Sequence, residues 1–140
     1  MKFLRTMTMA VAVSSAALTG LMLTQATPAV AANAAELRLQ TKLTGGAINN
    51  VTPEGEARFR QRGTEMSFKV EAEHVSLPDG TVLTVTIDRA GVTTNVGTIT
   101  LSFNEGELEL KNALAPTVQA GDIIIVSDAL NTPILTGVLK

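Results

Sequence analysis

The stretch that most constrains the fold is residues 80–88, in which apolar side chains alternate with polar ones. Leu83, Val85 and Ile87 share one face of an extended chain, and threonines occupy the other face. This period of two is typical of a β-strand with one buried side. The turn residues at 77–80, Leu-Pro-Asp-Gly, mark where the strand begins. Such a strand needs others that cover its apolar face.

Similar alternation recurs along the chain after residue 35, and turn residues separate the segments. It predicts strands at 36–43, 56–62, 66–73, 80–88, 96–103, 107–111, 123–126 and 134–139. Residues 123–126 are apolar on both faces, which predicts a central strand covered on both sides. No segment after residue 35 has the pattern of a helix.

Two hairpins follow from matching the apolar faces of consecutive strands. A turn at 63–64 sets Phe59 opposite Phe68 and Ala57 opposite Val70. A turn centred on 105–106 sets Leu108 opposite Phe103 and Leu110 opposite Leu101. A slip of one residue would turn every apolar side chain to the wrong face.

About eight short strands without a helix predict an all-β fold. We expect an antiparallel two-sheet sandwich of immunoglobulin-like or related type, and a small β-barrel is the alternative. The chain has no cysteine, so core packing and strand pairing must hold the domain together without disulfides.

Residues 1–31 have the pattern of a secretory signal peptide. Lys2 and Arg5 precede an apolar segment, and Ala29-Val30-Ala31 is a small-x-small cleavage signal. An uncleaved spanning helix is the alternative, although several Ser and Thr residues dilute the apolar run. The sequence therefore predicts one secreted or periplasmic domain, residues 32–140, without a stable membrane span after cleavage.

The net charge of the chain bears on whether it binds nucleic acid. The formal net charge of the full chain is −2, and it becomes more negative once Lys2 and Arg5 are removed. A mildly acidic domain of this kind is not expected to bind nucleic acid.

Arg58, Arg60 and Arg62 alternate on one predicted strand face at intervals of about 6.6 Å. These three arginines are the candidate surface-contact residues, suited to a sulfated or phosphorylated polymer. The alternative is that they pair across strands with Glu65, Glu71 and their neighbours.

His74, Glu71 and Glu73 are the other residues that could carry chemistry. His74 could act as a proton shuttle or a metal ligand, or lie at the end of a strand, hydrogen-bonded to backbone. Glu71 and Glu73 could form a paired-carboxylate site, or belong to a solvated strand face. No second histidine or cysteine completes a zinc shell. We therefore expect no catalytic, metal or cofactor site, and no enzyme activity.

Several acidic residues lie at predicted turns, where calcium ligands are often found. None falls in a spaced multi-carboxylate loop, so we interpret them as turn formers. They are Asp79, Asp88, Glu105, Asp122 and Asp128.

The segment from Leu43-Thr44-Gly45 through Pro53 and Gly55-Glu56-Ala57-Arg58-Phe59 to Phe68-Lys69-Val70 resembles the opening of chordin-type (CHRD-like) secreted bacterial β-domains. The second half is similar to small exported bacterial β-sandwich proteins with a Leu-Pro-x-Gly-Thr strand. The family's His-x-His phrase is missing, because His74 stands alone. The resemblance implies a secreted β-sandwich of undefined role.

Three functional hypotheses follow. The first is an exported, non-catalytic protein that acts by surface contact as a cell-envelope or extracellular-matrix component, with a protein or polysaccharide partner. The second is a binding module for an anionic polymer or partner protein through the three arginines. The third is a small hydrolase using Glu71, Glu73 or His74. The first strand could also add to the open edge of a neighbouring copy, which would give self-association; pairing within its own domain is the alternative.

Overall fold

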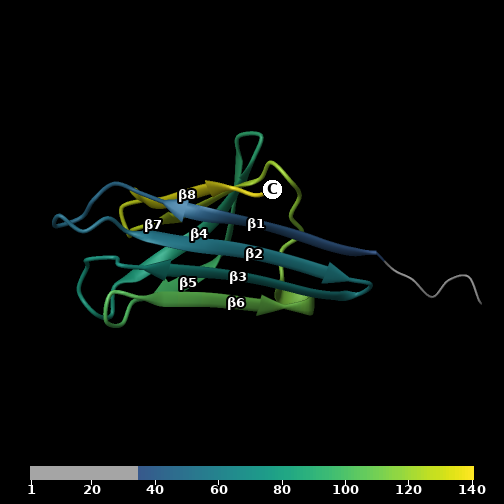
Figure 1. Ribbon diagram of the computed structural model, residues 1–140, viewed down its shortest axis with the longest axis horizontal. Helices are drawn as coiled ribbons and strands as arrows, with labels where there is room; N and C mark the ends of the chain where they lie inside the picture. The colour runs from purple at the N-terminus through teal and green to yellow at the C-terminus, as the bar shows by residue number, and fades with distance from the viewer. Residues whose placement is uncertain (1–34) are drawn as a thin grey trace, which may run out of the picture. The chain divides into compact units, whose positions relative to one another are not determined.

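The computed structural model describes residues 35–140, which fold into eight antiparallel strands and one short 3-10 turn (Figure 1). The elements are β1 (Glu36–Thr44), β2 (Glu54–Arg62), β3 (Glu65–Glu73), β4 (Val82–Arg89), β5 (Val92–Thr100), β6 (Gly106–Lys111), η3 (Asn112–Leu114), β7 (Ile123–Ser127) and β8 (Pro133–Val138). The all-β prediction is confirmed. The predicted signal peptide lies outside the described residues. Within 35–140, no helix has the length and apolar character needed to span a bilayer.

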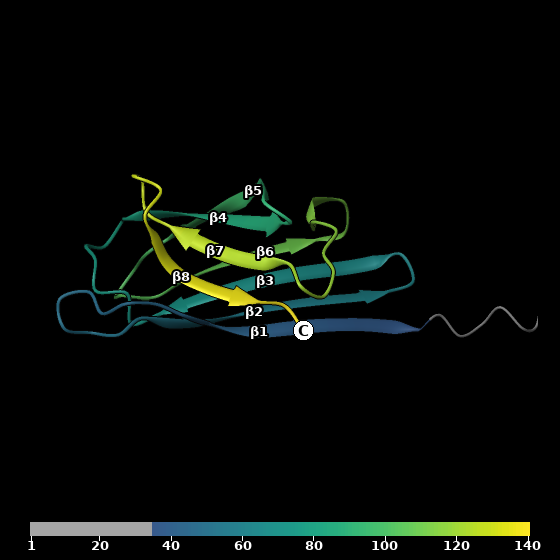
Figure 2. The same ribbon diagram turned by 90° about the horizontal axis from the view of Figure 1, so that it is seen from above.

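The strands form one strongly curved sheet in the order β5-β4-β7-β8-β1-β2-β3-β6. Figure 2 shows β1, β2 and β3 on one side and β4, β5 and β7 on the other. The join between the two halves is narrow. Strands β8 and β1 are paired at Thr44 and Thr136, and Gln40 and Lys140 exchange backbone hydrogen bonds of 3.0 and 3.2 Å.

The curvature brings the two edge strands, β5 and β6, into contact. A Cβ placed on Gly97 of β5 would lie 3.0 Å from Cδ2 of Leu108 on β6, so the leucine packs directly on the glycine backbone. A larger residue at this position would require the Leu108 side chain to shift by a few tenths of an ångström. The sheet is therefore nearly closed and barrel-like.

The predicted hairpin between β2 and β3 is confirmed residue by residue. Phe59 lies opposite Phe68, and Ala57 lies opposite Val70. All four side chains are buried, as the matched alternation requires. They form part of one core to which every strand except β6 contributes buried residues, with Leu108 and Leu110 of β6 packed against it.

Strand β7 lies between β4 and β8, which confirms its predicted central place. Its two faces are not equally covered, however. Ile124 and Val126 are fully buried, whereas Ile123 is exposed and Ile125 is half-buried. The prediction of a strand covered on both sides was therefore wrong at Ile123, because one face of the curved sheet points to solvent.

The predicted hairpin between residues 96–103 and 107–111 was wrong. Strand β6 pairs with β3, with Leu108 opposite Val70 and Leu110 opposite Phe68. The turn is centred on Phe103 and Asn104, whose φ angles are 54° and 71°. Phe103 consequently points outward and is 84 % exposed. Alternation specifies the face that a strand buries, but it does not specify which neighbour the strand pairs with.

The gap left between the predicted strands at 80–88 and 96–103 is shorter in the structure. Strand β5 begins at Val92, after a tight turn at Ala90 and Gly91 whose φ angles are 52° and 86°. Residues 92–95 are polar or exposed, so they carry no alternation that a sequence pattern could detect.

Candidate functional site

The strands β1, β2, β3 and β6 present a charged surface on the side away from the core, which we call the outer face. It consists of the side chains that alternate with the buried residues of these strands. The carboxylates are Glu36, Glu54, Glu56, Glu65, Glu71, Glu73, Glu107 and Glu109. The cations are Arg38, Lys42, Arg58, Arg60, Arg62, Lys69 and Lys111.

The register of the four strands sorts these charges along the strand direction. At one end, which we call the acidic end, Glu54 lies opposite Glu73, and Glu56, Glu71 and Glu107 follow one another across three strands. The two neighbouring rows form the basic belt, whose cations are Arg38, Arg58, Arg60, Lys69 and Lys111. The separation has two exceptions, because Glu109 lies opposite Lys69 within the belt and Lys42 lies opposite Glu56 at the acidic end. The outer face therefore carries segregated charge although the protein's net charge is small.

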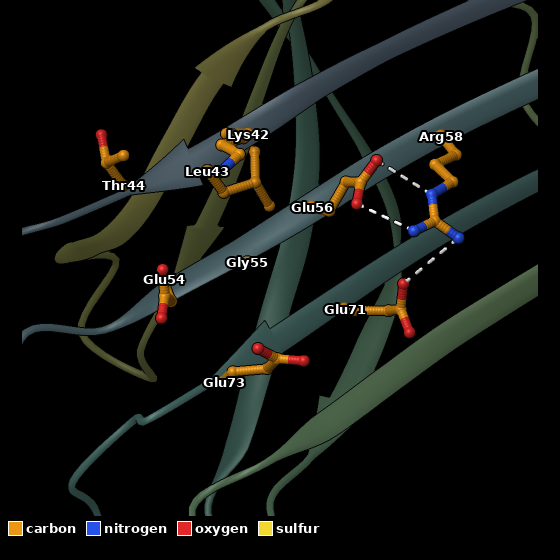
Figure 3. A pocket seen from close by; sticks show the side chains of 9 residues that line it. All are labelled: Lys42, Leu43, Thr44, Glu54, Gly55, Glu56, Arg58, Glu71 and Glu73. Carbon is orange, nitrogen blue, oxygen red and sulfur yellow. Dashed lines mark hydrogen bonds and ion pairs between the residues drawn. The ribbon is translucent and has the colours of Figure 1, made fainter.

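Arg58 lies at the boundary between the two regions (Figure 3). Its Nε and Nη2 donate hydrogen bonds of 2.9 and 2.8 Å to the two carboxylate oxygens of Glu56, and Nη1 lies 3.8 Å from Glu71. The hydrogen bonds from Arg58 lower the pKa of Glu56, and the carboxylate raises the pKa of Arg58.

Other ion pairs link the rows of the outer face. Lys69 Nζ lies 3.2 Å from Glu71 and 3.0 Å from Glu107, and these carboxylates raise the pKa of Lys69. Glu36 accepts hydrogen bonds from Arg38 and Arg60, which lower the pKa of Glu36. All these groups are accessible to solvent, so each pair contributes little to stability.

The three arginines singled out from the sequence all lie on the outer face, on β2. Arg58 is bound by Glu56 of its own strand and lies 3.8 Å from Glu71 across strands, and Arg60 is bound across strands by Glu36. Arg62 lies opposite Glu65 in the register, but within residues 35–140 no carboxylate lies within 4.0 Å of its guanidinium. The structure thus places Arg58 and Arg60 in two separate groups of ion pairs, Arg58 with Glu56 and Glu71 and Arg60 with Glu36, and leaves Arg62 beside them.

A hollow of about 290 Å³ lies over the acidic end (Figure 3). Its charged lining residues are Lys42, Glu54, Glu56, Arg58, Glu71 and Glu73. Ligand pockets for small molecules are usually concave and mostly apolar. This hollow is polar and open to solvent, and is suited to contact with water, ions or a polar surface.

His74 directly follows β3 and has a φ angle of 55°. Its Nδ1 lies 3.2 Å from Oε1 of Glu54, and both side chains are exposed. The sequence left two interpretations open for His74, a proton shuttle or metal ligand, and a strand-end residue hydrogen-bonded to backbone; the structure places it at the end of the strand. Its side chain lies beside a carboxylate, that of Glu54.

In the part of the chain that the structure describes, Glu54, Glu73 and His74 could hold a metal ion, because their ligand atoms lie within 4.8 Å of one another. Two carboxylates and one imidazole are donors for a divalent transition metal. The sequence pattern missed this group because Glu54 falls between the predicted strands at 36–43 and 56–62. The cross-strand register sets it directly opposite Glu73.

Most of the acidic turn residues bind backbone amides, as expected of turn formers. Asp79 Oδ1 accepts a hydrogen bond of 2.7 Å from the Phe103 amide. Asp88 accepts one from Gly91, and Asp128 binds the amides of Leu130 and Thr132.

Asp122 is different, because its carboxylate is buried and bound by an arginine. Arg89 donates from Nε and Nη2 over 2.8 and 2.6 Å, and the Gln119 amide adds a third hydrogen bond of 2.9 Å. The hydrogen bonds from Arg89 lower the pKa of Asp122. The Arg89–Asp122 ion pair connects the loop before β7 to the end of β4. Sequence reasoning missed it because nothing in the pattern links residues so far apart.

The chain matches no known protein-family profile, and no curated protein shows significant sequence similarity to it.

Proposed function

We propose that this protein is exported and acts without catalysis, through contact between its outer face and a macromolecular partner in the cell envelope or extracellular matrix. The observation that carries the proposal is the segregation of the outer face into an acidic end and a basic belt. The signal-peptide pattern of residues 1–31 and the resemblance to secreted chordin-type β-domains support export.

Charge segregation of this kind favours contact with a partner. Exposed ion pairs such as Arg58–Glu71 and Lys69–Glu107 contribute little within the protein, so a partner with complementary charges can replace them at small cost. Such complementarity controls the association rate and the orientation of the partner. The partner is a protein or polysaccharide with its own separated charges.

The second part of the proposal concerns the fold type. We propose a two-sheet sandwich of immunoglobulin-like or related type, and the narrow join between β8 and β1 supports it. The contact between β5 and β6 at Gly97 and Leu108 is the observation that favours the alternative, a small barrel.

The first experiment tests export and contact together. The native protein is followed by cell fractionation, and the purified protein is immobilised and exposed to envelope extract over a range of salt concentrations. We expect the protein in the periplasm or medium, and partner retention that weakens with salt. Recovery in the cytosol, or salt-independent retention, would contradict the proposal.

A matched pair of variants identifies the surface. In one variant, Glu54, Glu73 and Glu107 are changed to Gln; in the other, Thr84, Thr93 and Thr98, on β4 and β5, are changed to Ser. Retention of the partner should fall only in the first variant. Equal retention in both variants would exclude the acidic end.

The alternative function, binding of an anionic polymer, is supported by the basic belt and by Arg62, which has no carboxylate within 4.0 Å of its guanidinium among residues 35–140. Replacing Arg58, Arg60 and Arg62 with Ser should abolish salt-sensitive retention on a sulfated or phosphorylated resin. Unchanged retention would remove this alternative.

A further inference from the structure

Strand β1 is covered along only part of its edge on the β8 side. Gln40 exchanges two backbone hydrogen bonds with Lys140, at 3.0 and 3.2 Å. Within residues 35–140, no strand pairs with this edge of β1 before Gln40. The other edge of β1 is fully paired, from Glu36 opposite Arg62 to Thr44 opposite Glu54.

The direction of the unpaired backbone groups follows from Gln40. In a strand, residues two apart direct their N–H and C=O groups to the same side. Because Gln40 directs both groups toward Lys140, Arg38 and Glu36 direct theirs toward the uncovered edge. Such a row of donors and acceptors can template a further strand.

Residues 36–38, Glu-Leu-Arg, are complementary to themselves in an antiparallel arrangement. With Leu37 on a two-fold axis, Glu36 lies opposite Arg38 of a second copy, and Arg38 lies opposite its Glu36. Both are residues whose backbone groups face the edge. Leu37, 43 % exposed, would meet Leu37 of the second copy on the side of the core.

We propose that β1 pairs with β1 of a second copy of this chain, antiparallel and centred on Leu37, to form a two-fold symmetric dimer. Opposite charges and apolar side chains directly across an antiparallel pair are stabilising, and a two-fold axis makes the contact isologous and closed. The dimer would join the two outer faces into one continuous surface. This pairing does not depend on the proposed function.

Other registers of the β1–β1 pair, and the other strand edges of the sheet, are less suitable for forming a dimer. Centring the pair on Arg38 would set two arginines opposite each other. It would also require the backbone N–H and C=O of Gln40, which are already hydrogen-bonded to Lys140. A parallel arrangement of the two β1 strands would place Glu36 beside Glu36 of the second copy, so that like charges would be neighbours. The edges of β5 and β6 pack against each other at Gly97 and Leu108.

Because the chain has no cysteine, a single introduced cysteine can test the proposed pairing by disulfide crosslinking. In Leu37→Cys, the two thiols would be directly opposite, with Cα atoms about 4.5 Å apart, as in a non-hydrogen-bonded antiparallel pair, within reach of a disulfide. We expect mild oxidation of the full-length protein to give a covalent dimer at least about tenfold faster than in Val82→Cys, because pairing raises the effective thiol concentration. Val82 is a matched control, 47 % exposed and on another strand.

Ala35→Cys tests the register. Ala35 is exposed and adjoins the same edge, but in the proposed pairing it opposes Leu39 of the second copy. Its own copy is then about 14 Å away along the strand, so this variant should crosslink no faster than Val82→Cys. Equal rates for Ala35→Cys and Leu37→Cys would overturn the register.

Arg38→Pro tests the edge without a thiol. Proline removes the edge-facing N–H and is tolerated on an uncovered edge, so the β1–β2 pairing should persist. Sedimentation should show a concentration-dependent dimer for the native protein and a monomer for Arg38→Pro, with matching circular dichroism. A native protein that stays monomeric at every concentration, with Leu37→Cys oxidising no faster than Val82→Cys, would overturn the proposal.

Discussion

Arg89 at the end of β4 holds the buried carboxylate of Asp122 through two hydrogen bonds, although the two residues are 33 positions apart in the chain. Asp122 is 1 % exposed, so its charge depends on this partner. The pair joins two strands, because Asp88 and Ile123, the neighbours of Arg89 and Asp122, face each other in the register.

Changing Asp122 to Asn should lower the free energy of unfolding by about 2 kcal/mol, because hydrogen bonds between charged groups are lost at a buried site. Urea denaturation measures the loss. Asp79→Asn is the control, since Asp79 is an exposed turn carboxylate, and it should change stability by less than about 0.5 kcal/mol. Equal losses would contradict a special role for the Arg89 pair.

The same carboxylate should make stability depend on acid pH. Arg89 lowers the pKa of Asp122 below its ordinary value of 3.8, so the native state binds this proton more weakly than the unfolded state does. The contribution is fully present above about pH 4 and is lost as the pH falls through the lowered pKa. The difference in urea midpoint between the native protein and Asp122→Asn should be constant from pH 7 to about pH 5 and shrink below about pH 4. A constant difference down to pH 2 would contradict this linkage.

Phe103 is a residue whose replacement should stabilise the protein. It combines a φ angle of 54° with 84 % exposure, so the backbone strain is not offset by burial. Asn tolerates this conformation better, and Phe103→Asn should raise the free energy of unfolding by about 1 kcal/mol. Thermal denaturation tests this. Leu130→Asn is equally exposed but has no positive φ, and should leave the melting temperature nearly unchanged.

Phe59 and Phe68 should dominate the stability of the core. They are buried opposite each other across β2 and β3. Phe68→Ala removes a large side chain from a packed site and should cost about 3–5 kcal/mol, a large part of the stability of a single domain. Phe103→Ala, at an exposed position, should cost far less. A small loss for Phe68→Ala would mean that the core collapses around the cavity.

Features that depend on residues close together in the sequence could be predicted, whereas features that depend on residues far apart in the sequence could not. The β2–β3 hairpin was predicted down to its residue pairs because a tight turn and two matching apolar faces determine one register. The pairing of β6 with β3 was missed because Leu108 and Leu110 satisfy the same apolar condition beside either neighbour. The candidate site shows the same division. The glutamates and arginines of β2 and β3 were visible as alternating charges, whereas Glu54 was not placed beside His74.

The sequence by itself determined the all-β class, the strand positions within a few residues and, for the strands with clear alternation, the side that faces solvent, because alternation is a local property of the chain. The tertiary structure decided which strands are neighbours, how the charges of the outer face line up in rows, and that Arg89 binds Asp122. Those features depend on contacts between distant segments: the charge rows form only when β6 pairs beside β3, and the Arg89–Asp122 pair forms only when β7 pairs beside β4. The uncovered edge at Glu36 and Arg38 is likewise visible only in the folded sheet, although its self-complementary residues can be read in the sequence.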